Sequence, residues 1–327
     1  MSARPRVFAT RNIPSPGMDL LKSECDVTIW PHGRIISHEE LTENVAGVDG
    51  ILCHYINTID EQVLDAAGPN LKVVATFAVG YDLIDVEACH KRNVQVGHTP
   101  NVLSDSVAEL AVALLLASSR RLKEGMADIT NGQADGKWES GLYLSGPETK
   151  GSTVGIIGLG RIGLAVAKRL KGFDVARFLY YDIAEVPLAV EVSAEFASFE
   201  RLLSESDFVL ACCSSNSDNY GLFDKEAFKK MKNSAVFVNV TRGILVNQDD
   251  LYEALTTGQI FAAGLDATTP EPISKNHPLV KLDNCIILPH IGSSTTTTRN
   301  NMSILTAKNI LAGLKGEALI QCVKKKA

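Results

Sequence analysis

Short apolar runs recur along the chain, and segments long enough to form helices separate them. Runs rich in β-branched and aliphatic residues that alternate with helical patterns are typical of βαβ units with parallel strands. The later runs are apolar without strict alternation, as expected of strands covered on both faces. The pattern predicts an α/β fold with parallel sheets. The expected strands are 6–10, 26–30, 50–54, 72–77, 94–97, 153–157, 178–182, 207–213, 235–240, 262–266 and 285–288.

A long helix is expected between the first five runs and the later six. Ser106 and Glu109 have the S-x-x-E spacing of a capping box and precede the apolar stretch LAVALLLASS. Arg120 and Arg121 follow, and their positive charge favours a helix C-terminus at that point. Residues 130–152 are rich in Gly and Ser and are expected to form a long loop, which is usually functional or part of an interface.

The composition restricts the class of protein. A chain of 327 residues exceeds what one hydrophobic core usually contains, so two domains are expected. The net charge of −6 argues against a nucleic-acid or anionic-membrane partner, since either would select a basic surface. The longest apolar run, 111–117, is too short to cross a bilayer, and MSARPRVFAT lacks the apolar segment of a signal peptide.

The cysteines indicate a reducing compartment. There are seven, an odd number, and none forms a C-x-x-C motif. Cys212 and Cys213 are adjacent within an apolar run, which favours buried thiols over a disulfide. A cytoplasmic location is therefore expected. No group of His and Cys has the spacing of metal ligands, so no metal site is predicted.

A glycine-rich motif predicts a dinucleotide site. TVGIIGLGRIGLAVAKRL contains G-x-G-x-x-G at Gly158, Gly160 and Gly163, after an apolar run and at the start of an amphipathic helix. Asp182 stands at the end of the next expected strand, which completes the fingerprint. The phosphates would lie at the N-terminus of the helix, where free N–H groups favour anions. A glycine turn in another kind of α/β protein is the alternative, but it would not require strand, helix and acidic residue together.

Asp182 also bears on the choice of cofactor. A carboxylate at this position accepts hydrogen bonds from the ribose hydroxyls of NAD and repels the 2′-phosphate of NADP. Between Asp182 and Arg201 the chain has four Glu and neither Lys nor Arg. We therefore expect NAD(H) to be preferred, with NADP(H) disfavoured.

Reactive side chains follow three of the later expected strands. VNVTRG contains Arg242, LDATTPEP contains Asp266 and Glu271, and ILPHIGSS contains His290. Residues at the carboxyl ends of strands line the ligand crevice of an open α/β sheet. About half of the chain precedes the glycine motif, so a second domain is expected, and a cleft between domains is a common place for a substrate. Taken alone, His290 could equally be a cap or a core residue.

Five segments of the chain resemble, in the same order, motifs of the D-isomer-specific 2-hydroxyacid dehydrogenases. They are FAVGYDLID, GIIGLGRIG, VNVTRG, GLDATTPEP and ILPHIGSS. The resemblance covers nearly the whole chain, and the C-terminal half is most similar to the animal glyoxylate/hydroxypyruvate reductases of that family. It implies two Rossmann-like domains, with an NAD-binding domain (103–290) inserted in a flavodoxin-like substrate domain (1–102 and 291–327). It also implies reduction of a small 2-keto acid, hydroxypyruvate or glyoxylate, to the D-2-hydroxy acid. The helix after Ser106 and the loop of residues 130–152 are expected to build a homodimer.

The same resemblance implies roles for individual residues. His290 would be the general acid that protonates the keto oxygen, and Glu271 would hold its imidazole, because a carboxylate partner favours the protonated ring. Arg242 would bind the substrate carboxylate and keto oxygen with its planar fork of donors. Asp266 would orient the nicotinamide carboxamide. The other matching positions are the backbone N–H groups of Val79 and Gly80 for the substrate, and Arg161, Ile162, Val240 and Gly292 for the cofactor.

The chain departs from its animal relatives at three places. Asp182 stands where those enzymes carry a Gly-Arg pair and favour NADPH. A Trp-rich loop that reaches the partner subunit's substrate site is rewritten here, and Tyr143 aligns with its specificity tryptophan while Trp138 is the other large aromatic residue. A second histidine near the catalytic one is absent.

Two other functions stay open at this point. The NADH-sensing C-terminal binding protein corepressors share this fold and its Arg, Glu and His, but they carry long tails, which this sequence does not show. A phosphoglycerate dehydrogenase is the second alternative. Its substrate phosphate would favour more basic residues near FAVGYDLID than occur there.

Overall fold

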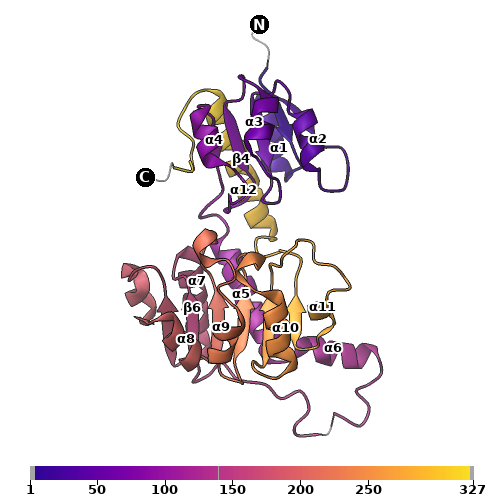
Figure 1. Cartoon of the computed structure of the whole chain (residues 1–327), viewed down its shortest axis with the longest axis vertical. Helices are drawn as coiled ribbons and strands as arrows, with labels where there is room; N and C mark the ends of the chain where they lie inside the picture. Colours follow the sequence, from indigo (N-terminus) through magenta and orange to yellow (C-terminus); the bar gives the residue numbers. More distant parts are fainter. Residues whose placement is uncertain (1–3, 139, 325–327) are drawn as a thin grey trace. The chain divides into compact units, whose positions relative to one another are not determined.

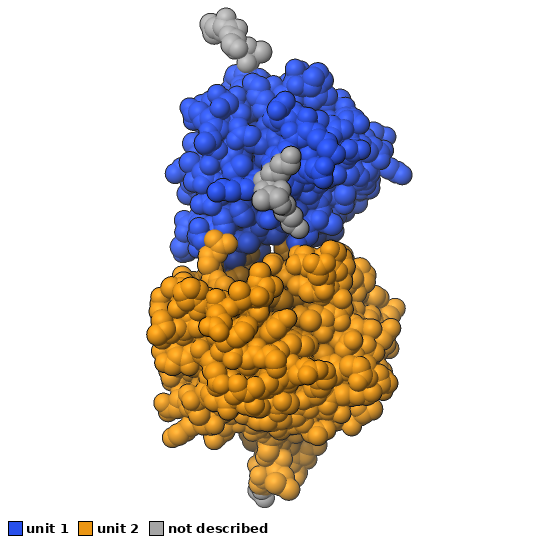
Figure 2. All heavy atoms as spheres, turned by 60° about the vertical axis from the view of Figure 1, so that its left-hand side comes forward, with its two compact units in different colours: residues 1–103, 294–327 blue, residues 104–293 orange. Residues whose placement is uncertain are grey.

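The chain forms two compact units. The computed structural model describes residues 4–138 and 140–324. Unit 1 comprises residues 1–103 and 294–327, and unit 2 comprises residues 104–293 (Figure 2). In sequence, unit 2 is therefore inserted between two segments of unit 1.

Unit 1 is built on a five-stranded parallel sheet with the order β2-β1-β3-β4-β5. β3 and β4 are buried along their whole length, whereas the edge strand β2 alternates between exposed and partly buried positions. The order reverses between β1 and β3, as in flavodoxin-like sheets. The strands are β1 (Arg6–Ala9), β2 (Asp26–Ile29), β3 (Gly50–Cys53), β4 (Val73–Thr76) and β5 (Gln95–Gly97).

Helices cover both faces of this sheet (Figure 1). The last helix returns to unit 1 from the far end of the chain and packs on α1 and on β3, β4 and β5. Its approach to α1 requires a glycine, since a Cβ added at Gly17 would lie 2.2 Å from the Ser303 carbonyl oxygen. The helices are α1 (Ser15–Glu24), α2 (His38–Asn44), α3 (Glu61–Ala67), α4 (Val86–Lys91) and α12 (Thr296–Leu314).

Unit 2 has a seven-stranded parallel sheet with the order β12-β11-β10-β9-β6-β7-β8. The reversal lies between β6 and β9, the Rossmann arrangement extended by one strand. The prediction of an α/β fold with two parallel sheets is confirmed. The strands are β6 (Thr153–Ile157), β7 (Arg177–Tyr181), β8 (Ala194–Phe196), β9 (Phe208–Ala211), β10 (Val236–Asn239), β11 (Ala262–Leu265) and β12 (Cys285–Ile287). β8 was not predicted, because this short edge strand is only partly buried and has no apolar run.

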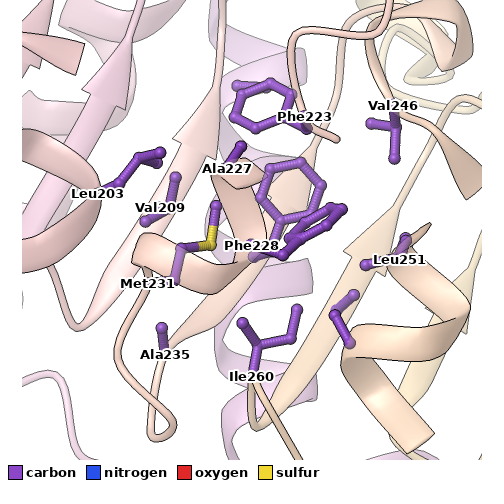
Figure 3. Close-up of a cluster of buried hydrophobic side chains, with 14 of the residues drawn as sticks. Leu203, Val209, Phe223, Ala227, Phe228, Met231, Ala235, Val246, Leu251 and Ile260 are labelled. Carbon is purple, nitrogen blue, oxygen red and sulfur yellow. The ribbon is translucent and has the colours of Figure 1, made fainter. Parts of the chain in front are cut away.

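One face of the unit 2 sheet carries an aromatic core (Figure 3). Phe223 and Phe237 have ring centroids 4.7 Å apart, and Phe228 meets Phe237 edge-on at 5.6 Å. Burial of aromatic rings in this geometry stabilises the packing of helices on the sheet. The helices of unit 2 are α5 (Ser104–Ser119), α6 (Leu122–Thr130), α7 (Arg161–Leu170), α8 (Phe199–Glu205), α9 (Lys225–Lys230), α10 (Gln248–Thr256) and α11 (Pro278–Lys281). The described residues of unit 2 also form 3₁₀ segments at Lys171–Phe173, Pro187–Val192, Ser217–Asn219 and Gly243–Leu245.

For the helix that lies between the two sheets in sequence, the expected start was wrong, whereas the expected end at Arg120 and Arg121 is confirmed. α5 begins at Ser104, so Ser106 is a buried residue inside the helix and does not form a capping box with Glu109. Ser106 belongs to the buried face of α5. Packing of this face therefore stabilises helix on the N-terminal side of Ser106, as far as Ser104. Arg121 has a left-handed backbone (φ 54°) that ends α5, but a second helix, α6, follows at once. Beyond α6, the described residues up to 152 form turns and loop, as expected.

Candidate active site

The glycine motif forms a close turn where β6 and β9 diverge. Gly158 has a φ of 89°, and a Cβ there would lie 2.5 Å from the Cys213 Cα just after β9. A Cβ at Gly163 would lie 2.3 Å from the Gly158 carbonyl oxygen, so α7 packs tightly on the turn. A Cβ at Gly160, by contrast, would meet no atom within 4 Å. The turn thus leaves open space at the one glycine that the pyrophosphate of a dinucleotide would approach.

The N-terminus of α7 is suited to phosphate. Gly160 is its N-cap residue and supplies no side-chain hydrogen bond, and the first turn contains no acidic residue. Arg161, which is exposed, and Ile162, which is partly buried, are the first residues of the helix. The free N–H groups and the helix dipole at this end favour an anion.

Asp182 lies directly beside the glycine turn. Its Oδ2 accepts a hydrogen bond from the Leu159 N–H at 3.0 Å, and its Oδ1 accepts one from the Ile183 N–H at 2.8 Å. The carboxylate is therefore fixed at the carboxyl end of β7, next to the turn after β6. A dinucleotide whose phosphates lie on α7 would bring a ribose to this carboxylate.

His290 and Glu271 form a paired group. His290 Nδ1 lies 3.1 Å from Glu271 Oε1 and 3.0 Å from Oε2, and each side chain is only 21% exposed. Glu271 Oε1 also accepts a hydrogen bond from the Thr268 N–H at 3.1 Å, which fixes the carboxylate. Because Nδ1 faces the carboxylate, the second ring nitrogen, Nε2, is the atom of His290 that can transfer a proton.

Asp266 holds the loop that carries His290. The side chain is 2% exposed, and its two oxygens accept hydrogen bonds from the Ile291 and Gly292 N–H groups, both at 2.7 Å. Burial raises the pKa of the Asp266 carboxyl, and the two N–H donors oppose this shift. His290 has a left-handed backbone with a φ of 53°, which is uncommon outside glycine. The Asp266 carboxylate therefore stabilises an otherwise unfavourable turn at the histidine.

Arg242 follows β10, the neighbour of β11 in the sheet. Its backbone carbonyl accepts a hydrogen bond from Asn239 Nδ2 at 2.9 Å, and its Nη1 donates to the Thr241 carbonyl at 2.9 Å. Asn239 Oδ1 also accepts from the Thr241 hydroxyl at 2.7 Å, and Val240 between them is buried. Asn239 was not predicted as part of the site, although a polar residue at the end of a buried strand is a usable signal.

Four of the predicted residues of unit 2 thus follow the carboxyl ends of three adjacent strands. β10 leads to Arg242, β11 to Asp266 and Glu271, and β12 to His290. Parallel strands place such groups along one edge of the sheet. An imidazole paired with a carboxylate, and a guanidinium two strands away on the same edge of the sheet, can donate a proton and hold an anion.

Val79 and Gly80 lie in unit 1, just after β4. The Val79 carbonyl accepts a hydrogen bond from His98 Nδ1 at 2.9 Å, and the Tyr81 ring meets the His98 ring edge-on at 5.4 Å. These contacts fix the loop, so its backbone geometry does not depend on a ligand.

Tyr143 lies far from His290 within unit 2. Its hydroxyl donates to Asp128 Oδ2 on α6 at 2.8 Å. Its loop packs at the C-terminus of α5, where a Cβ at Gly146 would lie 1.9 Å from the Ser119 carbonyl oxygen. The loop after His290 lies at the other end of this 16-residue helix, which is about 24 Å long. Within one chain, Tyr143 therefore does not join the other predicted residues.

Comparison with known proteins agrees with this geometry. A family model described as "D-isomer specific 2-hydroxyacid dehydrogenase, NAD binding domain" matches residues 112–292, more than half of the chain. The chain belongs to this family. It is accordingly an NAD(P)-dependent oxidoreductase, and the predicted resemblance is confirmed.

Individual relatives cover nearly the whole chain. The human protein named glyoxylate reductase/hydroxypyruvate reductase is 50% identical over 317 residues, which is 96% of each chain. A crystal structure of a Thermus thermophilus protein covers 98% of this chain and 100% of its own, with 38% identity and a TM-score of 0.89. A Sinorhizobium meliloti glyoxylate/hydroxypyruvate reductase, described as NADPH-dependent and solved with NADP and malonate, is 27% identical, with a TM-score of 0.84 over 99% of this chain and 100% of its own.

Two further observations bear on the earlier expectations. Within the described part of the chain, no helix combines the length and apolar character needed to cross a membrane. All seven cysteines are free thiols, and Cys212 is buried while Cys213 is partly buried, as predicted.

Replacing Asp266 with Asn should loosen the turn at His290. An amide has one acceptor oxygen, so one of the two N–H groups would lose its partner, at a cost of about 1–3 kcal/mol if the buried Gly292 N–H is the one affected. We expect faster amide hydrogen exchange at Ile291 and Gly292 and a lower unfolding temperature. The exposed Asp249→Asn serves as the matched control. Unchanged exchange at both amides would contradict the role given to Asp266.

Proposed function

We propose that this enzyme reduces a small 2-keto acid, hydroxypyruvate or glyoxylate, to the D-2-hydroxy acid with a hydride from NADH. The observation that carries the proposal is the His290–Glu271 pair at one edge of a Rossmann sheet, in a chain of this dehydrogenase family. The substrate class follows the human relative, whose name specifies glyoxylate and hydroxypyruvate. No observation favours the corepressor or phosphoglycerate alternatives.

We assign cofactor binding to unit 2 and a substrate-binding role to unit 1. Gly160 leaves room for the pyrophosphate at the N-terminus of α7, in the turn that Gly158 and Gly163 close tightly. When bound, the nicotinamide supplies the hydride. The other cofactor contacts that we assign are Arg161 and Ile162 at the start of α7, Asp182 at the ribose, and Val240, Asp266 and Gly292 at the nicotinamide end.

His290 is the proton donor in this proposal. Glu271 holds Nδ1 and favours the protonated ring, which leaves the Nε2 proton available for the keto oxygen. The Arg242 guanidinium binds the substrate carboxylate and draws electron density from the keto group. The N–H groups of Val79 and Gly80 supply further donors to the carboxylate.

Asp182 supports a preference for NADH over NADPH. Its carboxylate is held beside the glycine turn, where a 2′-phosphate would meet a negative charge. The residues from Ile183 to Glu200 contain no basic side chain to offset that repulsion. This differs from the Sinorhizobium relative, which is described as NADPH-dependent.

We also propose that the enzyme is a homodimer formed through a segment that we call the arm, residues 122–138 and 140–146. The arm extends from the rest of unit 2 (Figure 1). α6 has no buried residue, although it is amphipathic, and apolar side chains on the arm face solvent. They are Leu122, Met126, Ile129, Trp138 and Leu142, between 51% and 84% exposed. Such a group of exposed apolar residues is typical of a protein interface, and a second copy would bring Tyr143 to a partner.

Substitution of His290 by Asn tests the general acid. Asn tolerates the left-handed backbone but cannot donate an acidic proton. We expect kcat for hydroxypyruvate reduction to fall by about 10²–10⁴-fold, while the NADH dissociation constant, measured by fluorescence, changes less than twofold. The control is His277→Asn, which preserves the helix cap that His277 provides to α11. Turnover at the wild-type rate would rule out His290 as the acid.

The cofactor preference is tested by comparing kcat/KM for NADH and NADPH, followed at 340 nm. We expect kcat/KM to be about tenfold or more higher with NADH than with NADPH. Asp182→Ala should lower this NADH-to-NADPH ratio, because it removes the charge that repels the 2′-phosphate. Glu185→Ala, an exposed acid three residues further on, should leave the ratio unchanged. A wild-type preference for NADPH would overturn the role assigned to Asp182.

The homodimer is tested by mass in solution. Light scattering of the wild type should give twice the chain mass of 35.2 kDa. Met126→Glu should shift the population toward monomer, because a charge would be buried at the interface. Val190→Glu, at another exposed apolar residue of unit 2, should not. A monomeric wild type would remove the proposal.

A further inference from the structure

We propose that His54 of unit 1 selects the substituent at C3 of the substrate, so that the enzyme favours 2-keto acids with an oxygen-bearing C3 group. This inference rests on the proposed function and narrows its substrate class. C3 of hydroxypyruvate carries a hydroxyl, C3 of pyruvate is a methyl group, and glyoxylate has no C3.

His54 lies at the place where a flavodoxin-like sheet binds its ligands. It directly follows β3, and the strand order reverses between β1 and β3. Loops at such a reversal diverge and leave a crevice at the carboxyl ends of the strands. Thr10, directly after β1, and His54, directly after β3, therefore both stand at this reversal.

The backbone of His54 is held in place by Asn57. Asn57 Oδ1 accepts a hydrogen bond from the His54 N–H at 2.9 Å and another from the Thr10 hydroxyl at 2.7 Å. Asn57 is itself buried, so both bonds are shielded from water. The two loops at the reversal are thus joined, and the histidine is presented on a fixed backbone.

The imidazole has an unused hydrogen-bonding atom. His54 Nε2 is buried and has no hydrogen-bond partner among the described residues. The ring packs edge-on against Phe77, with centroids 5.3 Å apart, so its orientation is fixed by an apolar contact. A buried nitrogen without a partner destabilises a fold, and its retention calls for an explanation such as a ligand.

The surroundings of His54 favour an oxygen acceptor. Burial, together with the charges of Arg11 and Arg299, lowers the pKa of His54 to about 4. The ring is therefore neutral near pH 7, and as a neutral imidazole it can donate one N–H. The Arg299 guanidinium lies 5.5 Å from the Phe77 ring centroid and donates to the Ser294 hydroxyl at 2.8 Å. The positive charges of Arg11 and Arg299 and the N–H of the neutral His54 ring favour a hydroxyl or carboxylate oxygen as the neighbouring ligand group. They do not favour a methyl group.

His54 is also close to the loop assigned to the substrate carboxylate. Phe77, which contacts His54, begins the loop that continues to Val79 and Gly80. β3 and β4 are hydrogen-bonded neighbours, and adjacent strands lie about 5 Å apart. A three-carbon keto acid whose carboxylate meets the Val79 and Gly80 N–H groups could therefore place its C3 substituent toward His54.

The test compares substrates and variants of the full-length enzyme. We would measure kcat/KM for hydroxypyruvate, pyruvate and glyoxylate with the wild type, His54→Leu and His54→Gln. Wild type should favour hydroxypyruvate over pyruvate by at least tenfold. His54→Leu should lower kcat/KM for hydroxypyruvate about tenfold, the effect of one lost hydrogen bond, and change the other two less than twofold. His54→Gln retains a donor and should keep most of the selectivity.

Controls separate this role from stability and from the proposed function. His90→Leu, on α4, should leave kcat/KM unchanged for all three substrates. Thermal unfolding checks that each variant is folded. If His54→Leu fails to fold, the ratio of kcat/KM for hydroxypyruvate to kcat/KM for pyruvate, measured in the wild type and in His54→Gln, still tests the inference. A wild type that reduces pyruvate as well as hydroxypyruvate, or equal losses for all three substrates in His54→Leu, would overturn the inference alone. A wild type that reduces none of these acids with either cofactor would overturn the proposed function as well.

Discussion

The hydrogen bonds from Ile291 and Gly292 to the buried Asp266 carboxylate support the geometry of the candidate site. They join β11 to the loop after β12 and stabilise the left-handed backbone of His290. With the backbone in this position, Nδ1 faces Glu271, which itself follows β11. A change at Asp266 would therefore alter the direction of the proton donor without touching the imidazole.

A second constraint is the close approach of backbones where each sheet reverses. In unit 2, Gly158 meets Cys213, and the Asp182 carboxylate is bonded to the same turn, so the shape and the charge of the dinucleotide site are set together. In unit 1, Asn57 joins the loops after β1 and β3. Both sheets thus have hydrogen-bonded polar groups at the reversal, the position where open α/β sheets bind ligands.

Much of the fold could be predicted from the sequence, because the signals are local. Buried parallel strands are continuous apolar runs, and the eleven expected runs are all strands. The edge strand β8 has no such run and was missed. The start of α5 was misplaced for a related reason, since Ser106 resembles a capping residue locally but is buried by contacts made in the folded unit.

The sequence by itself determined the two parallel sheets, the glycine turn with Asp182, and the order of Arg242, Glu271 and His290 along the chain. Each of these depends on neighbouring residues or on a fixed spacing. The tertiary structure alone decided three other properties. It joined Asp266 to Gly292, placed Tyr143 at the far end of α5, and left His54 Nε2 buried without a partner among the described residues. These depend on which distant segments meet when the chain folds, and local patterns along the chain do not encode such contacts.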